Sequence, residues 1–141
     1  MFTMDEFIVS QTATRLNIDN TPEEKILANL QMLVATMEQV RKLLGGNPIH
    51  ISSGYRCPAL NRAIGSSSTS AHTLGYAADF MCPKFGTPKE VALKIAESNI
   101  KFDQLIFESV WVHISIDPRN RRELLTAHFG NGKTTYTKGI E

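Results

Sequence analysis

A histidine and an aspartate that could bind one metal lie seven residues apart, with a glycine between them. On one straight helix, His72 and Asp79 would be separated by about 10 Å along the axis, whereas zinc holds its His and Asp ligand atoms at about 2.0 to 2.2 Å. A shared metal therefore excludes a straight helix. Gly75 permits backbone angles that are closed to other residues. A bend there, followed by a short strand over 76–81, would return Asp79 to the side of His72.

A third ligand is predicted from strand alternation. Residues 104–107 and 110–116 are rich in β-branched and aromatic side chains, which is typical of a hairpin. Because side chains alternate along a strand, His113 shares a polar face with Trp111, while aliphatic residues occupy the other face. Two imidazoles and one carboxylate are typical of an open catalytic zinc site, since structural sites are usually closed and rich in thiolates. We therefore predict one zinc ion per chain, bound by His72, Asp79 and His113.

Three helices are predicted from capping residues and from the spacing of apolar side chains. The segment Thr21–Glu24 has the pattern of a capping box, and apolar residues then recur at three- and four-residue steps as far as Gly45-Gly46. Thr87–Glu90 repeats the capping pattern and begins a helix that extends to about Ser98. A short helix from Met4 to about Leu16 is expected before them.

Strands complete the predicted fold. Residues 48–53 alternate apolar and polar side chains, and 124–129 and 134–137 have strand character. The small residues of 65–70 are typical of a loop, which we expect at the active site. The prediction is an α+β fold in which helices pack on a small antiparallel sheet that carries the zinc site. A chain of this length forms one core, so residues 1–141 are expected to be a single domain.

Composition limits the partners. The formal charge is +1, with 21% charged and 42% apolar residues, so neither nucleic acid nor membrane lipid is expected as the main partner. The N-terminus has no basic region followed by an apolar segment, and no apolar run approaches the length of a membrane span. We expect a monomer that is made in the cytoplasm, is not inserted into a membrane, and acts elsewhere only after release. Cys57 and Cys82 are expected to be buried thiols.

The order of these residues is specific enough to compare with a family. The pattern consists of Ser70-x-His72-x-x-Gly75-x-Ala77-x-Asp79, preceded by Ser53-Gly54-Tyr55-Arg56 and Leu60-Asn61 and followed by Trp111-Val112-His113. It resembles the M15 zinc peptidases, which include D-alanyl-D-alanine carboxypeptidase-like enzymes and phage endolysins that cut peptidoglycan stem peptides. The hedgehog signalling domain has the same zinc motif. The resemblance covers roughly residues 7–115.

The resemblance makes His72, Asp79 and His113 the zinc ligands and gives Arg56 a role beside them. Arg56 would bind a substrate carboxylate or polarise its carbonyl, and its planar fork suits a carboxylate. A structural ion pair is the alternative for Arg56. Ser70 either contacts substrate or caps a turn.

A general base is required beside the zinc, and Glu108 is the candidate because it lies close in sequence to His113. Many members of the family have their acidic residue three positions before the last histidine, where this chain has Val110. An exposed turn glutamate is the alternative, and Asp103 is the second candidate for the base. Trp111 either lines the substrate groove or packs over the metal site.

The expected function is hydrolysis of an amide bond in a peptidoglycan stem peptide, after phage lysis or virion-associated entry brings the protein to the wall. Carboxypeptidase, D,D-endopeptidase and L-alanyl-D-glutamate endopeptidase activities all use these residues, and we expect the loop 65–70 to select among them. The alternatives are a non-catalytic, zinc-stabilised cell-wall-binding module and a phage structural component. The basic cluster at Arg119, Arg121 and Arg122 is given no role, since charge runs are usually solvated.

Overall fold

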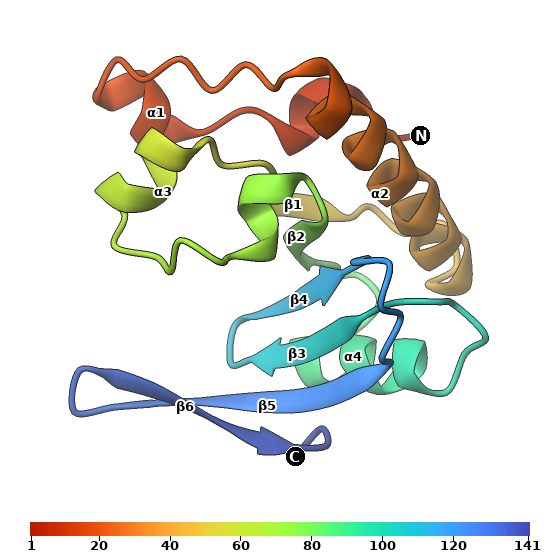
Figure 1. Cartoon of the computed structure of the whole chain (residues 1–141). Coiled ribbons are helices and arrows are strands. Elements are labelled where there is room, and N and C mark those ends of the chain that lie inside the picture. Colours follow the sequence, from red (N-terminus) through yellow and green to blue (C-terminus); the bar gives the residue numbers. More distant parts are fainter.

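One six-stranded sheet organises the chain, and helices flank it (Figure 1). The structure is a computed structural model that describes all residues from 1 to 141. The helical segments are η1 (Met4–Phe7), α1 (Gln11–Arg15), α2 (Glu24–Leu43), α3 (Pro58–Ala63), η2 (Ala71–Leu74) and α4 (Pro88–Ala96). The strands are β1 (His50–Ser53), β2 (Ala77–Met81), β3 (Gln104–Glu108), β4 (Trp111–Ser115), β5 (Glu123–Gly130) and β6 (Lys133–Lys138). The α+β class predicted from the sequence is confirmed.

The sheet is mixed, not wholly antiparallel as expected. Its strand order is β1-β2-β4-β3-β5-β6, and every neighbouring pair is antiparallel except β3 and β5. Strand β4 runs antiparallel to β3 and therefore ends beside the start of β3. A short connection leads from there to β5, which pairs with the other edge of β3 and runs parallel to it. Two backbone hydrogen bonds fix this start, from Arg122 to Phe102 and from Glu123 to Asp103.

The two faces of the sheet have different surroundings. One face carries buried apolar side chains, among them Phe80, Leu105 and Ile114, and α4 contacts β3 and β4. A cluster of 23 buried residues joins this face to α2 and α4. The opposite face carries Asp79 and His113, which are register partners on β2 and β4. Thus α2 and α4 pack on the apolar side of the sheet, and the polar face carries the candidate site.

The two predicted capping boxes have different outcomes. At Thr87 the box is confirmed, because the Thr87 hydroxyl accepts from the Glu90 amide at 3.2 Å and the Glu90 carboxylate accepts from the Thr87 amide at 3.0 Å. At Thr21 it is wrong: the Thr21 hydroxyl donates to Asp19 at 2.6 Å, and α2 begins only at Glu24. An aspartate two residues earlier therefore competed successfully for the capping threonine.

The first predicted helix is divided. Residues 4–16 form η1 and the short α1, and Ser10 between them caps α1 by accepting from the Ala13 amide at 3.1 Å. No helix of the structure is long and apolar enough to cross a membrane. Cys57 and Cys82 are buried free thiols, as predicted.

Candidate metal centre

The predicted bend at Gly75 brings His72 and Asp79 together. His72 lies in η2, Gly75 ends that segment with a φ of +75°, and β2 begins two residues later. His72 Nε2 consequently lies 3.3 Å from Oδ1 of Asp79. A side chain at Gly75 would be strained by its φ angle, and its Cβ would lie 3.0 Å from the carbonyl oxygen of Ile26. The glycine therefore allows both the turn and the close approach of α2.

His113 completes the cluster through strand pairing. It is the register partner of Asp79 across the β2–β4 ladder, and its Nδ1 lies 2.9 Å from the same Asp79 oxygen. One nitrogen of each ring and one oxygen of Asp79 all lie within 4.8 Å of one another. Ligand atoms at 2.1 Å from a tetrahedral zinc are about 3.4 Å apart. These three side chains could therefore hold such an ion with small adjustments.

The orientation of His72 is set by a backbone carbonyl. Nδ1 of His72 lies 2.7 Å from the carbonyl oxygen of Gly54, and this contact places a proton on Nδ1. The lone pair is then on Nε2, the atom that faces Asp79. Gly54 is held in turn because Tyr55 donates its amide to Phe7 at 2.7 Å. A Cβ at Gly54 would collide with the Phe7 carbonyl, so this turn requires glycine.

The charges of the cluster suit a cation. Burial raises the pKa of Asp79, but the charges and hydrogen bonds of His72 and His113 outweigh burial and lower it. Burial lowers the pKa of His72, with Asp79 opposing. The Asp79 carboxylate is therefore ionised at neutral pH, the state in which it can bind a cation.

A cleft of about 540 Å³ opens over the cluster. Its lining includes the four other residues predicted from the sequence: Arg56, Ser70, Glu108 and Trp111. Ser66, Ser67 and Thr69 of the predicted active-site loop also line it. The three candidate ligands leave the side that faces the cleft uncovered. The site is therefore open, and a water or a substrate group could take a fourth position on a bound metal.

Glu108 reaches the cluster although it precedes His113 by five positions. It pairs with Trp111 across the hairpin, so both side chains lie on the face that carries His113. Its Oε2 lies 3.9 Å from His113 Nδ1. Val110, three positions before His113, is exposed in the turn. The Glu108 side chain is largely buried, which contradicts the alternative of an exposed turn glutamate.

The environment of Glu108 suits a proton acceptor. Burial raises its pKa, the nearby His113 lowers it, and Asp79 raises it again, with a net increase. The indole of Trp111 donates to its Oε2 at 3.2 Å. Trp111 thus lines the cleft and positions the acid at once.

Arg56 lies in the cleft without an acidic partner. Its Nη2 donates to the Ser70 hydroxyl at 3.4 Å, its Nε is buried with no hydrogen-bond acceptor, and no carboxylate lies within ion-pair distance. The alternative of a structural ion pair is therefore not observed. The Ser70 hydroxyl also accepts from the His72 amide at 3.3 Å, so Ser70 caps η2 and contacts Arg56.

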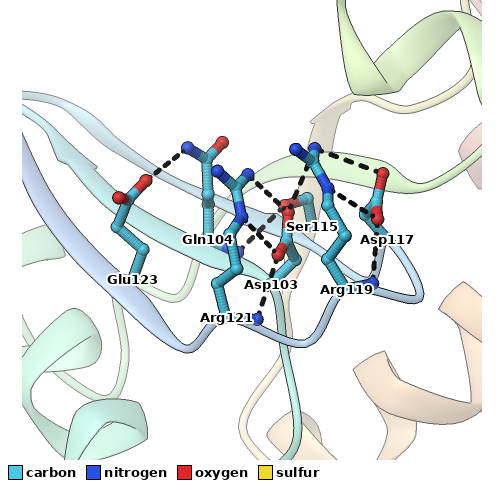
Figure 2. Close-up of polar contacts among 7 residues, drawn as sticks. All are labelled: Asp103, Gln104, Ser115, Asp117, Arg119, Arg121 and Glu123. Atoms are coloured by element: carbon cyan, nitrogen blue, oxygen red, sulfur yellow. Dashed lines mark hydrogen bonds and ion pairs between the residues drawn. The ribbon is translucent and has the colours of Figure 1, made fainter.

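Asp103, the second candidate for the base, is already engaged. Figure 2 shows its carboxylate held by Arg121, whose Nε and Nη2 donate at 2.8 Å each. Arg122 is also occupied, because it donates to the Ala96 and Ser98 carbonyls at the end of α4. Two residues of the basic cluster, Arg121 and Arg122, thus attach the segment before β5 to Asp103 and to the end of α4, whereas Arg119 is exposed.

The cleft residues that the sequence did not indicate include Leu125 and Tyr136, which lie on β5 and β6. Alternation along 134–137 could be read from the sequence, but the pairing that places this strand beside the site could not.

Comparison with known proteins agrees with this geometry. The sequence model of a family described as Peptidase M15 matches residues 1–115, which include every residue of the cluster and of the predicted site. No curated protein matches the chain.

Proposed function

Because the chain belongs to the M15 peptidase family, we propose that it is a zinc metallopeptidase that hydrolyses an amide bond in peptidoglycan stem peptides. The observation that carries the proposal is the convergence of His72, Asp79 and His113 in a cleft that also holds Glu108 and Arg56. The protein is expected to act as a monomer on the cell wall, after release from the cell that makes it.

The three clustered side chains would hold the metal. His72 would bind through Nε2, because its Nδ1 is committed to Gly54, and His113 through the Nδ1 that faces Asp79. A zinc ion bound there would supply a Lewis acid for a carbonyl and lower the pKa of a bound water toward about 7. The protein holds the ligand atoms together and keeps Asp79 ionised.

Glu108 is proposed as the general base. Its carboxylate lies at the edge of the cluster, and its raised pKa makes it a better proton acceptor than an exposed glutamate. It would take a proton from the attacking water and return it to the nitrogen of the leaving amine. The indole of Trp111, which donates to the Glu108 oxygen that faces His113, would orient the carboxylate for these transfers.

Arg56 is proposed to bind a substrate carboxylate. A half-buried guanidinium whose buried Nε has no acceptor gains from binding an anion, because part of its desolvation has already occurred. Peptidoglycan stems carry carboxylates on D-glutamate, on diaminopimelate and on the terminal D-alanine. The Ser70 hydroxyl holds one end of the guanidinium, which leaves the rest of its planar fork for the ligand.

Digestion of purified muropeptides tests this proposal. The zinc-loaded protein should release a fragment whose mass identifies the cut bond, and Glu108→Gln should reduce the rate by about 10² to 10⁴ while keeping its zinc. Glu97→Gln, an acid-to-amide change outside the cleft, is the control. If the zinc-loaded protein binds the wall but cleaves nothing at high concentration, the peptidase proposal is wrong and a zinc-stabilised binding module is supported.

A further inference from the structure

The C-terminal hairpin of β5 and β6 forms part of the cleft although it lies outside residues 1–115, the part matched by the family. In Figure 1 it extends along the edge of the sheet as a long two-stranded ribbon. Two of its side chains, Leu125 and Tyr136, line the same cleft as the metal cluster. The hairpin is thus a wall of the site that the shared family region does not include.

Polar contacts at the start of β5 fix the position of this wall (Figure 2). Asp103 binds Arg121 just before β5 begins, and Gln104 donates to the Glu123 carboxylate at 2.7 Å. At the far end, the Phe129 ring lies 6.4 Å from the ring of Trp111, between centroids. The β5–β6 hairpin therefore contacts the β3–β4 hairpin at both ends of β5.

Strand register places Tyr136 on the cleft face, level with Glu108. Phe107 pairs with Thr126 in the parallel ladder, so one further step puts Glu108 beside Ala127, the partner of Tyr136. Two strand spacings of about 4.8 Å separate the backbones of Glu108 and Tyr136. Ala127 between them has only a methyl group and is 6% exposed. The small residue leaves room for the tyrosine side chain to extend toward the metal cluster.

The Tyr136 hydroxyl is a free donor in this position. It has no hydrogen-bond partner within the protein, and the residue is 52% exposed. Burial of the phenol raises its pKa, and the charges of Glu108 and Asp79 raise it further, so the hydroxyl keeps its proton at neutral pH. The two acidic acceptors nearby already have proposed roles, Asp79 as a metal ligand and Glu108 as the base. A substrate carbonyl would be the natural partner for the phenol.

We propose that Tyr136 is a substrate-binding residue whose hydroxyl donates a hydrogen bond to a carbonyl oxygen of the peptide stem. This inference rests on the proposed function, because it names a second contact for the same substrate. Arg56 and Tyr136 then bind the stem from two separate elements, one through a carboxylate and the other through the peptide backbone. The hairpin thereby contributes to the choice of bond.

Removal of a single oxygen atom tests the inference. Tyr136→Phe should lower kcat/KM on a disaccharide-pentapeptide by roughly 3- to 10-fold, the effect of one hydrogen bond. In a Glu108→Gln background that cannot turn over, the same change should raise the Kd of the muropeptide by a similar factor, measured by calorimetry. Thr135→Val, a hydroxyl deletion at the neighbouring position on the other face of β6, is the control and should change neither value.

The outcomes separate the two proposals. If the unaltered protein cleaves the muropeptide and Tyr136→Phe has the same kcat/KM and Kd, the proposed tyrosine contact is wrong and the proposed function stands. Equal losses in Tyr136→Phe and Thr135→Val would also overturn it, because they would indicate a general disturbance of the hairpin. An unaltered, zinc-loaded protein that neither cleaves nor binds the muropeptide overturns the proposed function and this inference with it.

Discussion

The indole Nε1 of Trp111 donates a hydrogen bond to Oε2 of Glu108 across the β3–β4 turn, at 3.2 Å. The two residues are register partners at the end of the hairpin, and the same Glu108 oxygen lies 3.9 Å from His113. The turn leaves Val110 exposed outside the cleft and places Glu108 beside the cluster. The tryptophan holds that acid in place.

Replacement of Trp111 by phenylalanine should lower kcat by about 3- to 10-fold, because an aromatic ring remains while the N–H donor that orients Glu108 is lost. Zinc content should not change, since Trp111 contacts no ligand by a hydrogen bond. Steady-state kinetics on a muropeptide and metal analysis check both statements. The control is Phe129→Leu, which removes the ring beside Trp111 and keeps the Trp111 donor. It should lower kcat less. An unchanged kcat in Trp111→Phe would refute the positioning role.

Asp79→Ala should abolish zinc binding, because Asp79 supplies the oxygen on which both imidazoles converge. In the unaltered protein, zinc at 100 times its Kd should stabilise the fold by about 2.7 kcal/mol, and removal by a chelator should reverse this. Thermal unfolding with and without zinc measures the difference. His128→Ala, on β5 and outside the cleft, should keep the full stabilisation. Equal zinc stabilisation of Asp79→Ala would show that the ion binds elsewhere.

The parts of the site that depend on local chemistry could be predicted from the sequence. Gly75 signalled the bend, and alternation along β4 selected His113. Contacts between distant segments could not be predicted in this way. The Gly54 carbonyl that orients His72 depends on a loop packed against Phe7, and the approach of Tyr136 depends on the parallel pairing of β5 with β3. Neither the pairing partner nor the register of a strand follows from its own residues.

Gly75→Ala should destabilise the protein by about 2 to 3 kcal/mol. The left-handed backbone angle costs an alanine about 1 to 2 kcal/mol, and the added Cβ would lie 3.0 Å from the Ile26 carbonyl oxygen and 3.2 Å from Leu30. Gly65→Ala is a matched control, because its φ is +76° but nothing lies within 4 Å of the new Cβ. Urea unfolding of both variants separates the backbone cost from the steric one. Equal destabilisation would show that the contact with α2 contributes nothing.

The Asp103–Arg121 pair should make stability depend on pH in the acid range. Hydrogen bonds from Arg121 lower the pKa of Asp103, against burial, which raises it. A carboxyl whose pKa is lowered on folding stabilises the protein above its ordinary value of 3.8, and this contribution disappears as the pH falls below that value toward the folded pKa. Asp103→Asn should therefore unfold at a lower urea concentration than the unaltered protein at pH 6, and the difference should shrink at pH 3.

The two arginines around Asp103 provide the matched comparison. Arg121→Gln should cost about 2 kcal/mol at pH 7, because it leaves a carboxylate that is only 1% exposed without its bidentate partner. Arg119→Gln should cost less than about 1 kcal/mol, since Arg119 is 62% exposed and its Nη2 lies 3.8 Å from Asp103. Because Arg121 lies two residues before β5, which pairs with β3, its loss should also weaken the attachment of β5. Hydrogen exchange of the β5 amides should then accelerate in Arg121→Gln and not in Arg119→Gln; equal rates would show that backbone pairing alone holds the hairpin against the sheet.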